Sequence, residues 1–359
     1  MQPQVTSPGM SPPFQGKGGA AMFAAVVAVF LLLPILLHAW GLPPKFAVYR
    51  GITLEAGRFP YLGRLVTQDK GDIDLLFFGS SLVRASVDVP MVEQALREAG
   101  HGDPVVRMGG VNWPGLDMQY FLLRDLLERR RVKRVVLSMA VGQQDTVMPH
   151  VQLFRFLRWG DYADVFDGLT WRQGASLYGV MVLGAPRQAL TLARHNRVSD
   201  WSGDVTAPGQ PRTDELGYYG ARFVRVERRP PVIPAREMIY EPGGAGKFRF
   251  LNRRPNDYQW RFLLRLAGLL RQHHVQVLFL NTPMPEERDN NFVQERLPWM
   301  ELFGPGTRVI GVAPARLFAG MSEEDLYLHY YDQHLNRNGR EYFTRAILPA
   351  MLAIYGEGK

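Results

Sequence analysis

The chain of 359 residues contains no cysteine. This absence excludes disulfides, thiolate metal sites and a cysteine nucleophile, while leaving the cellular compartment open. The formal net charge of +8 is spread along the chain, and no zinc-finger spacing or RNA-binding signature accompanies it. Nucleic acid is therefore not an expected partner. Hydrophobic residues make up 46% of the chain, enough for one large domain or two modest ones with a buried core, and a single domain is the first expectation.

Charged residues are almost absent from the N-terminal region. Residues 1–41 contain one basic residue, Lys17, and no acidic residue. Residues 1–17 are rich in proline, glutamine, serine and glycine, which predicts a disordered tail. The following 23 residues, 18–40, carry no charged side chain. As a helix they would extend roughly 34 Å, which is enough to cross a bilayer.

This apolar segment is expected to be an uncleaved membrane anchor. It is longer than the apolar part of a signal peptide, and the residues that follow it offer no convincing small-x-small cleavage site. Its orientation is less clear from charge. Lys45 and Arg50 follow the segment, whereas Lys17 alone precedes it, so the positive-inside rule weakly favours a cytoplasmic domain.

The rest of the chain alternates short apolar runs with helical patterns, which predicts an α/β fold with a parallel sheet. We divide it into a linker over residues 41–70 and a domain over residues 71–359, with an insertion over residues 146–250. The expected strands lie within residues 73–79, 104–110, 132–142 and 275–283. The expected helices cover residues 89–100, 117–131, 258–274 and 339–355.

The first expected strand ends in Gly79, Ser80 and Ser81 instead of an ordinary turn sequence. Reactive groups in open α/β sheets gather beyond the carboxyl ends of the strands. A serine nucleophile needs a base, and the base needs a carboxylate. Asp332 and His334, just before the last expected helix, could supply both. Taken separately, the serines are equally consistent with a turn or a helix cap, and the Asp-x-His pair with a solvated loop.

These residues resemble the motifs of the SGNH (GDSL-type) hydrolase superfamily, over residues 72–145 and 270–355. The stretch "FFGSSLVRASVD" stands where that family has its Gly-Asp-Ser block, and "DQHLNRNG" resembles the final block. The resemblance implies Ser81 as the nucleophile, His334 as the base and Asp332 as the group that orients it. It also implies a flavodoxin-like three-layer sandwich with a parallel sheet.

The two intermediate blocks depart from the family pattern. In "VVRMGGVNWPG", Gly110 and Asn112 compete for the glycine position whose N–H helps to form the oxyanion hole. In "VGQQD", an amide donor is kept as Gln144 or Gln143 where the family has asparagine, and the longer side chain is aimed less tightly. The spacing Asp-x-His is one residue shorter than the commonest form and is similar to that of some polysaccharide-acetylating branches.

The resemblance implies a serine acyl-ester enzyme anchored in the bacterial inner membrane, with its domain in the periplasm. We expect O-acyl transfer, with acetyl as the favoured group, to or from an exported polysaccharide, beside a multispanning membrane O-acyltransferase and without metal or organic cofactor. One alternative is a lipid-directed esterase or thioesterase. Another is a non-catalytic subunit that binds glycan or scaffolds a membrane assembly.

Overall fold

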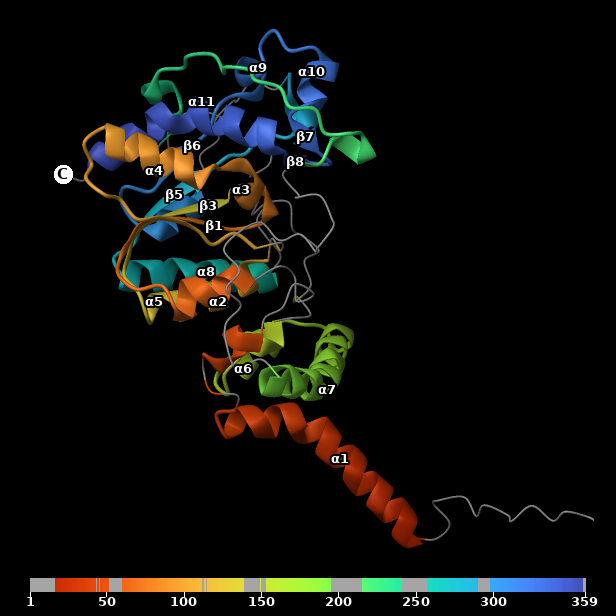
Figure 1. Cartoon of the computed structure of the whole chain (residues 1–359). Helices are drawn as coiled ribbons and strands as arrows, with labels where there is room; N and C mark the ends of the chain where they lie inside the picture. The colour runs from red at the N-terminus through yellow and green to blue at the C-terminus, as the bar shows by residue number, and fades with distance from the viewer. Residues whose placement is uncertain are drawn as a thin grey trace, which may run out of the picture.

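The computed structural model describes residues 17–42, 44, 46–51, 60–111, 113, 115–138, 149, 153–194, 215–240, 257–289 and 298–357. Residues 1–16 of the expected tail lie outside this part. Lys17 begins helix α1 (Lys17–Ala39), whose N-terminal part extends away from the rest of the molecule (Figure 1). Among the described residues, α1 is the one helix long and apolar enough to span a membrane.

The centre of the molecule is a six-stranded sheet with the order β2-β1-β3-β5-β6-β4. Each neighbouring pair is parallel except β4 and β6, which are antiparallel. The expected α/β class with a mostly parallel sheet is therefore confirmed, although the short β4 and β6 were not predicted. The strands are β1 (Ile73–Phe78), β2 (Val106–Met108), β3 (Val132–Ser138), β4 (Ile239–Tyr240), β5 (Gln276–Leu280) and β6 (Arg308–Ile310).

Helices cover both faces of this sheet, and this explains the unbroken apolar run of β1. Leu75 and Phe77 belong to one buried core, whereas Leu76 and Phe78 belong to the other. One face carries α2 (Pro60–Thr67), α5 (Leu116–Leu127) and α8 (Asp257–Gln272) (Figure 1). The opposite face carries α3 (Ser81–Ser86), α4 (Val89–Glu98) and α11 (Arg337–Gly356).

The strand order places a topological switch point at β1. The chain leaves β1 for β2 on one side of it and then crosses to β3 on the other. Connections in opposite directions leave a crevice beyond the carboxyl ends of two such strands, where ligands of open α/β sheets bind. The Gly79-Ser80-Ser81 sequence follows β1 and therefore lies at this crevice.

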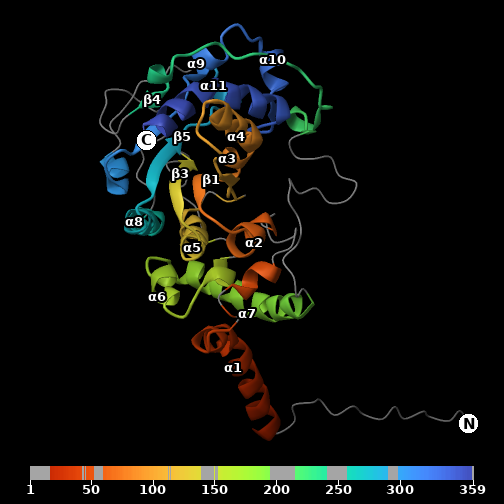
Figure 2. The same cartoon turned by 60° about the vertical axis from the view of Figure 1, so that its left-hand side comes forward.

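The described part of the expected insertion forms two pieces. Helices α6 (Asp161–Phe166) and α7 (Trp171–Arg194) lie between the sheet domain and α1 (Figure 2). Residues 215–240 run along the other side of the domain, near α10 (Glu323–Tyr327) and α11, and end in β4. Helix α2 lies inside the expected linker. The remaining short elements are η1 (Ala47–Gly51), η4 (Leu153–Phe156), η6 (Tyr218–Gly220), η7 (Ala235–Glu237), η8 (Pro285–Glu287), η9 (Pro298–Phe303), α9 (Pro314–Leu317), β7 (Tyr330–Tyr331) and β8 (His334–Leu335).

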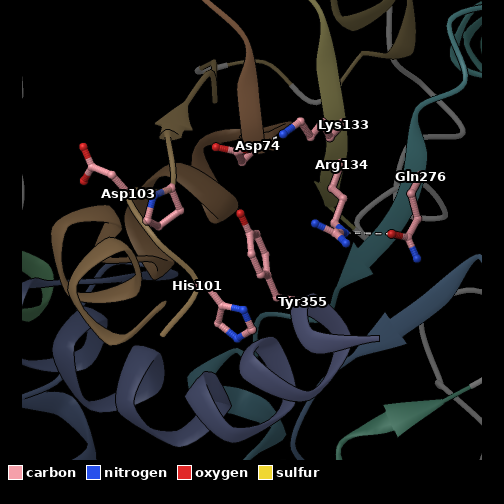
Figure 3. Close-up of a pocket in the computed structure, with 8 residues that line it drawn as sticks. Asp74, His101, Asp103, Lys133, Arg134, Gln276 and Tyr355 are labelled. Carbon is pink, nitrogen blue, oxygen red and sulfur yellow. Dashed lines mark hydrogen bonds and ion pairs between the residues drawn. The ribbon is translucent and has the colours of Figure 1, made fainter. Parts of the chain in front are cut away.

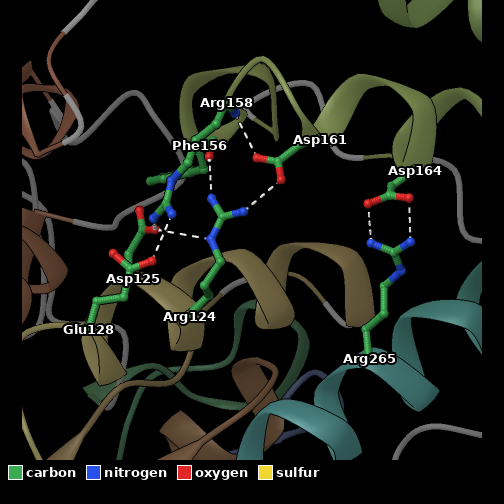
Figure 4. A network of polar contacts seen from close by, with 8 residues as sticks. All are labelled: Arg124, Asp125, Glu128, Phe156, Arg158, Asp161, Asp164 and Arg265. Carbon is green, nitrogen blue, oxygen red and sulfur yellow. Dashed lines mark hydrogen bonds and ion pairs between the residues drawn. The ribbon is translucent and has the colours of Figure 1, made fainter. Parts of the chain in front are cut away.

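Ion pairs fasten α6 and the residues before it to the sheet domain (Figure 4). Arg124 of α5 donates to Asp161 over 2.7 Å, and Arg158 donates to the buried Asp125 over 2.5 Å. Arg265 of α8 makes a two-pronged contact with Asp164. Because these bonds come from two helices of the domain, α6 is held in a defined position against it.

Candidate active site

The turn after β1 depends on glycine. Gly79 has a φ of +147°, and a Cβ atom there would lie 2.9 Å from the Cβ and 3.1 Å from the backbone nitrogen of Ser138. Both the backbone conformation and the close approach to the end of β3 exclude other residues without strain. The first strand therefore turns sharply against β3 and presents the two serines at its carboxyl end.

The two serines have different surroundings. Ser80 is buried and is the N-cap of α3, where its hydroxyl accepts a hydrogen bond from the Leu82 N–H over 3.3 Å. Ser81 is the first residue of α3 and is half-buried. Its Oγ lies 2.7 Å from Nε2 of His334. The structure thus gives Ser80 a capping contact and brings Ser81 to the expected base.

His334 is carried by a two-stranded hairpin that the sequence pattern did not predict. Strand β8 (His334–Leu335) pairs with β7 (Tyr330–Tyr331), and Tyr331 lies opposite His334. The two rings stack with their centroids 5.3 Å apart. Tyr330 is fully buried, and its hydroxyl donates to the Pro283 carbonyl over 3.0 Å. The hairpin is therefore anchored in the core beside the base.

The residues that follow His334 hold the hairpin on α11. Leu335 is buried, and Asn336 caps α11 by accepting from the Gly339 N–H over 3.2 Å. A Cβ atom at Gly339 would lie 2.1 Å from the His329 carbonyl oxygen, so the first turn of α11 packs directly on the chain before the hairpin. The sequence "HLNRNG" is thus a structural support for the base as well as its carrier.

Burial lowers the pKa of His334 below its usual value of 6.5. The nearby charge of Asp332 opposes this shift, and the positive charge of Arg84 adds to it. The imidazole is therefore neutral near pH 7, which is the form that a general base needs. Arg84 lies on α3, one turn after Ser81, so the helix that carries the hydroxyl also carries a charge that acts on the base.

Asp332 is placed differently from the expectation. It is exposed, lies in the turn of the hairpin with a φ of +50°, and raises the pKa of the neighbouring Tyr219 hydroxyl. The Nδ1 atom of His334 is buried and has no hydrogen-bond partner among the described residues. The structure therefore brings Ser81 and His334 together, but it does not bring the Asp332 carboxylate to Nδ1.

Tyr219, like Asp332, has a positive φ, of +42°. Strained backbone at non-glycine residues is concentrated at functional sites. Tyr219 is exposed, and its neighbour Tyr218 stacks on Tyr327 of α10 with the ring centroids 4.1 Å apart. Tyr218 and Tyr219 were missed because "LGYYG" is separated from both motifs and has no spacing that links it to them. Arg84 could have been found from its helical spacing to Ser81.

The expected oxyanion donors are described in part. Gly110 follows β2, and a Cβ atom there would lie 2.9 Å from the Arg84 Cβ, so the loop packs against α3. The flanking N–H groups of Gly109 and Val111 donate to the carbonyls of Phe77 and Gly79, over 2.7 Å each. Asn112, Gln143 and Gln144 lie outside the described residues.

A cavity of about 450 Å³ lies at the amino ends of β1, β3 and β5 (Figure 3). Asp74, Lys133 and Arg134 contact other groups that line it, and Asp103 pairs with Arg97. Lys133 Nζ lies 2.6 Å from Asp74 Oδ1, and Arg134 Nε lies 2.8 Å from Gln276 Oε1. Neither contact joins a hydroxyl to a histidine, as the Ser81–His334 contact does, so we place the candidate active site at the carboxyl end of β1.

Comparison with protein-family models, with curated proteins and with solved structures finds no match to this chain. The described residues contain no group of three or more His, Asp or Glu side chains that could hold a metal ion. The chemistry of the site is therefore argued from the contacts of Ser81 and His334 themselves.

Proposed function

We propose that this protein is a serine acyl-ester enzyme in which Ser81 is the nucleophile and His334 the general base. The observation that carries the proposal is the 2.7 Å contact between Ser81 Oγ and His334 Nε2 at the carboxyl end of β1. A hydroxyl hydrogen-bonded to a neutral imidazole is the arrangement that makes serine nucleophilic. The lowered pKa of His334 supports its role as a base.

The proposed reaction has two halves. Ser81 Oγ bonds to the acyl carbon of the donor ester while His334 takes the hydroxyl proton. The negative oxygen that forms is stabilised by backbone N–H groups, for which those of Ser81 and Gly110 are the candidates. The donor's C–O bond then breaks, and His334 returns the proton to the leaving oxygen. An acceptor hydroxyl reverses these steps and frees Ser81.

In this proposal the Asp332 carboxylate turns from the Tyr219 hydroxyl to His334 Nδ1 when substrate binds. Asp332 is two residues before His334, and its exposed carboxylate interacts with the exposed Tyr219 hydroxyl, whose pKa it raises. A substrate that takes up the Tyr219 hydroxyl would release the carboxylate, which could then accept a hydrogen bond from His334 Nδ1. This contact would fix the imidazole tautomer and stabilise the imidazolium.

We further propose an SGNH-like enzyme that transfers O-acetyl groups to, or removes them from, an exported polysaccharide. The parallel strands have the doubly wound order that such a fold requires, and the Ser and His motifs occupy the matching ends of the chain. The tyrosines at positions 218, 219 and 327 offer aromatic and hydroxyl groups for a sugar ligand beside the site. A periplasmic domain anchored in the bacterial inner membrane by α1, beside a multispanning O-acyltransferase, completes this proposal.

The test is covalent labelling of the full-length protein in detergent micelles with a serine-directed fluorophosphonate, followed by peptide mapping. We expect the label on Ser81, and we expect Ser81→Ala to abolish labelling while Ser80→Ala keeps it. An activated acetyl ester, offered with and without candidate oligosaccharides, then separates transfer from hydrolysis by mass spectrometry. Acetylated oligosaccharide supports transfer, and free acetate alone, at a rate independent of acceptor, supports an esterase.

A non-catalytic glycan-binding or scaffolding subunit is the second candidate. The observation that favours it is the His334 Nδ1 atom, which is buried and has no hydrogen-bond partner among the described residues. A base with an unsatisfied buried nitrogen is poorly oriented for repeated turnover. Full-length folded protein that resists the fluorophosphonate at every serine would favour this candidate over the enzyme.

A further inference from the structure

Helix α7 has an unusual composition for a surface helix. Its 24 residues, Trp171–Arg194, include three arginines and no acidic residue. The 14 residues between Arg172 and Arg187 carry no charged side chain. Surface helices of globular proteins normally place charged residues along the face that water contacts. The sequence of α7 therefore does not fit a helix that lies in water.

The outward face of α7 carries exposed leucines between its arginines. Leu177, Met181 and Ala185 are buried at four-residue spacing and form the face that packs on the domain. Leu183 follows Met181 by two residues, about 200° around the helix, and is 79% exposed. Leu190 on the same outward face is 51% exposed. Arg172 and Arg187 lie on the same face. The leucines can therefore enter lipid while the long arginine side chains reach the headgroups.

The exposed apolar residues beyond α1 are concentrated in this region. After Leu42, the described residues include eight large apolar side chains that are exposed, and four of them lie between positions 159 and 190. Trp171, at the start of α7, is 77% exposed, and Trp159, just before α6, is 55% exposed. Tryptophan is enriched where proteins meet the boundary between lipid and water.

Helix α7 also contacts the apolar segment of α1. The Tyr178 hydroxyl donates to the Leu31 carbonyl over 2.5 Å, and the Tyr162 hydroxyl of α6 donates to the Pro34 carbonyl over 3.3 Å. In Figures 1 and 2, α6 and α7 lie on the side of the domain from which α1 extends. A bilayer that surrounds α1 would therefore approach α7 from its outward side.

The length of α1 before its bend brings the membrane boundary close to α6 and α7. Figure 1 shows α1 bent, and Pro34 inside the helix removes a backbone donor and crowds the preceding turn. Residues 17–33 before this proline extend roughly 25 Å as a helix, less than the hydrocarbon thickness of about 30 Å. The membrane boundary must therefore reach the bend of α1, which is where α6 and α7 make their contacts.

We propose that α7 lies in the plane of the membrane interface, with Leu183, Leu190 and Trp171 inserted among the lipids and its arginines on anionic headgroups. Three arginines without any acidic residue give the helix the charge that complements such headgroups. With α1 as the only membrane contact, the domain would be free to rotate. The contact of α7 with the membrane holds the domain at one height and orientation above the bilayer. This proposal does not depend on the proposed acyl chemistry.

The absence of cysteine makes the test direct, because one introduced cysteine is a unique labelling site. Leu183→Cys and Leu190→Cys are labelled with the fluorophore NBD in the full-length protein, reconstituted into phosphatidylcholine vesicles containing phosphatidylglycerol. The matched control is Val232→Cys, which is 95% exposed on the residues 215–240 that run along the far side of the domain. All three positions are exposed, so the substitutions should leave the fold intact.

We expect quenching by doxyl-labelled lipid to be several-fold stronger at positions 183 and 190 than at 232, and quenching by aqueous iodide to be several-fold weaker. Replacing Arg172, Arg187 and Arg194 by glutamine should make the lipid quenching independent of the phosphatidylglycerol fraction. Iodide quenching at 183 equal to that at 232 overturns the proposal. Protection at 183 from both quenchers also overturns it, because a protein would then cover the face.

Discussion

Ser81 and His334 are 253 positions apart in the sequence, and their side chains meet over 2.7 Å. The contact joins the end of the first strand to a hairpin placed just before the last helix. Both partners are held by short-range structure, since Ser80 caps the helix of the nucleophile and Asn336 caps the helix that follows the base. This double support is what a catalytic pair needs to keep its geometry.

The two serines should separate catalysis from stability. Ser81→Ala removes the proposed nucleophile, and we expect esterase or transferase activity to fall by on the order of 10⁴-fold with unchanged thermal stability. Ser80→Ala removes an N-cap hydrogen bond, and we expect a loss of about 1 kcal/mol in unfolding free energy with most of the activity kept. Activity on an acetyl ester and a thermal melt of each variant provide the measurements.

The same pair should behave as one unit. The double variant Ser81→Ala/His334→Ala is expected to be no less active than Ser81→Ala alone, because the base has no proton to take once the hydroxyl is gone. Losses that add in free energy would mean that the two residues act independently, and the shared mechanism would be wrong.

Gly79 should tolerate no side chain. Ala at this position would place a Cβ 2.9 Å from the Cβ of Ser138 in a backbone conformation that L-residues avoid. We expect Gly79→Ala to lower the free energy of unfolding by at least about 2 kcal/mol. The control is Gly268→Ala in α8, where a Cβ meets nothing within 4 Å and helix propensity should add up to about 1 kcal/mol. Equal stability of the two variants would contradict the close approach.

Asp117 should make stability depend on pH. Burial raises the pKa of this carboxyl from 3.8 to about 6, although the Tyr258 hydroxyl donates to it over 3.1 Å. A raised pKa in the folded state means that stability is lost as the pH rises from about 4 through 6, by on the order of 3 kcal/mol in total. Asp117→Asn keeps an acceptor for Tyr258 and removes this loss.

The measurement is the difference in unfolding free energy between Asp117→Asn and the parent, in micelles at pH 4 and pH 8. We expect the difference to favour the variant more at pH 8. A difference that is the same at both pH values would show that Asp117 titrates normally in the folded protein.

Much of the sheet could be predicted because its strands are buried on both faces and read as continuous apolar runs. Leu75 to Phe78 are an example, with alternate residues in the two cores. The strands β4, β7 and β8 have two residues each, too few for any periodicity, and they depend on tertiary contacts. Thus the hairpin that carries His334 could not be read from its own pattern.

The candidate site divides in the same way. Ser81 comes just after a glycine turn, and His334 comes just before a capped helix. Both are local features that a sequence can show. The neighbour of Asp332 could not be predicted, because Tyr219 comes from a segment more than one hundred residues away. That segment is placed by the stacking of Tyr218 on Tyr327 of α10 and by the contact of Arg225 with Glu341 of α11. An Asp-x-His spacing says which carboxylate is near the histidine, but not which hydrogen bond the carboxylate makes.

The pH dependence of activity on the acidic side should depend on the two charges near His334. Burial and Arg84 lower the pKa of His334, whereas Asp332 raises it. A base is active when it is unprotonated, so activity should rise with pH through a midpoint below 6.5. Arg84→Gln removes a nearby positive charge and should move this midpoint to higher pH. Asp332→Asn removes a negative charge and should move it to lower pH, in profiles of kcat/KM for an acetyl ester.

The same profiles test the release of Asp332 from Tyr219. Tyr219→Phe removes the hydroxyl that interacts with the Asp332 carboxylate and leaves the ring in place. The freed carboxylate can turn to Nδ1, which stabilises the imidazolium, so the midpoint should move to higher pH while activity is kept. In the double variant Tyr219→Phe/Asp332→Asn this upward movement should vanish, and kcat should fall by on the order of 10²-fold or more. If Asp332→Asn changes neither midpoint nor kcat, Asp332 is no part of the catalytic unit, and His334 works with its Nδ1 unpaired.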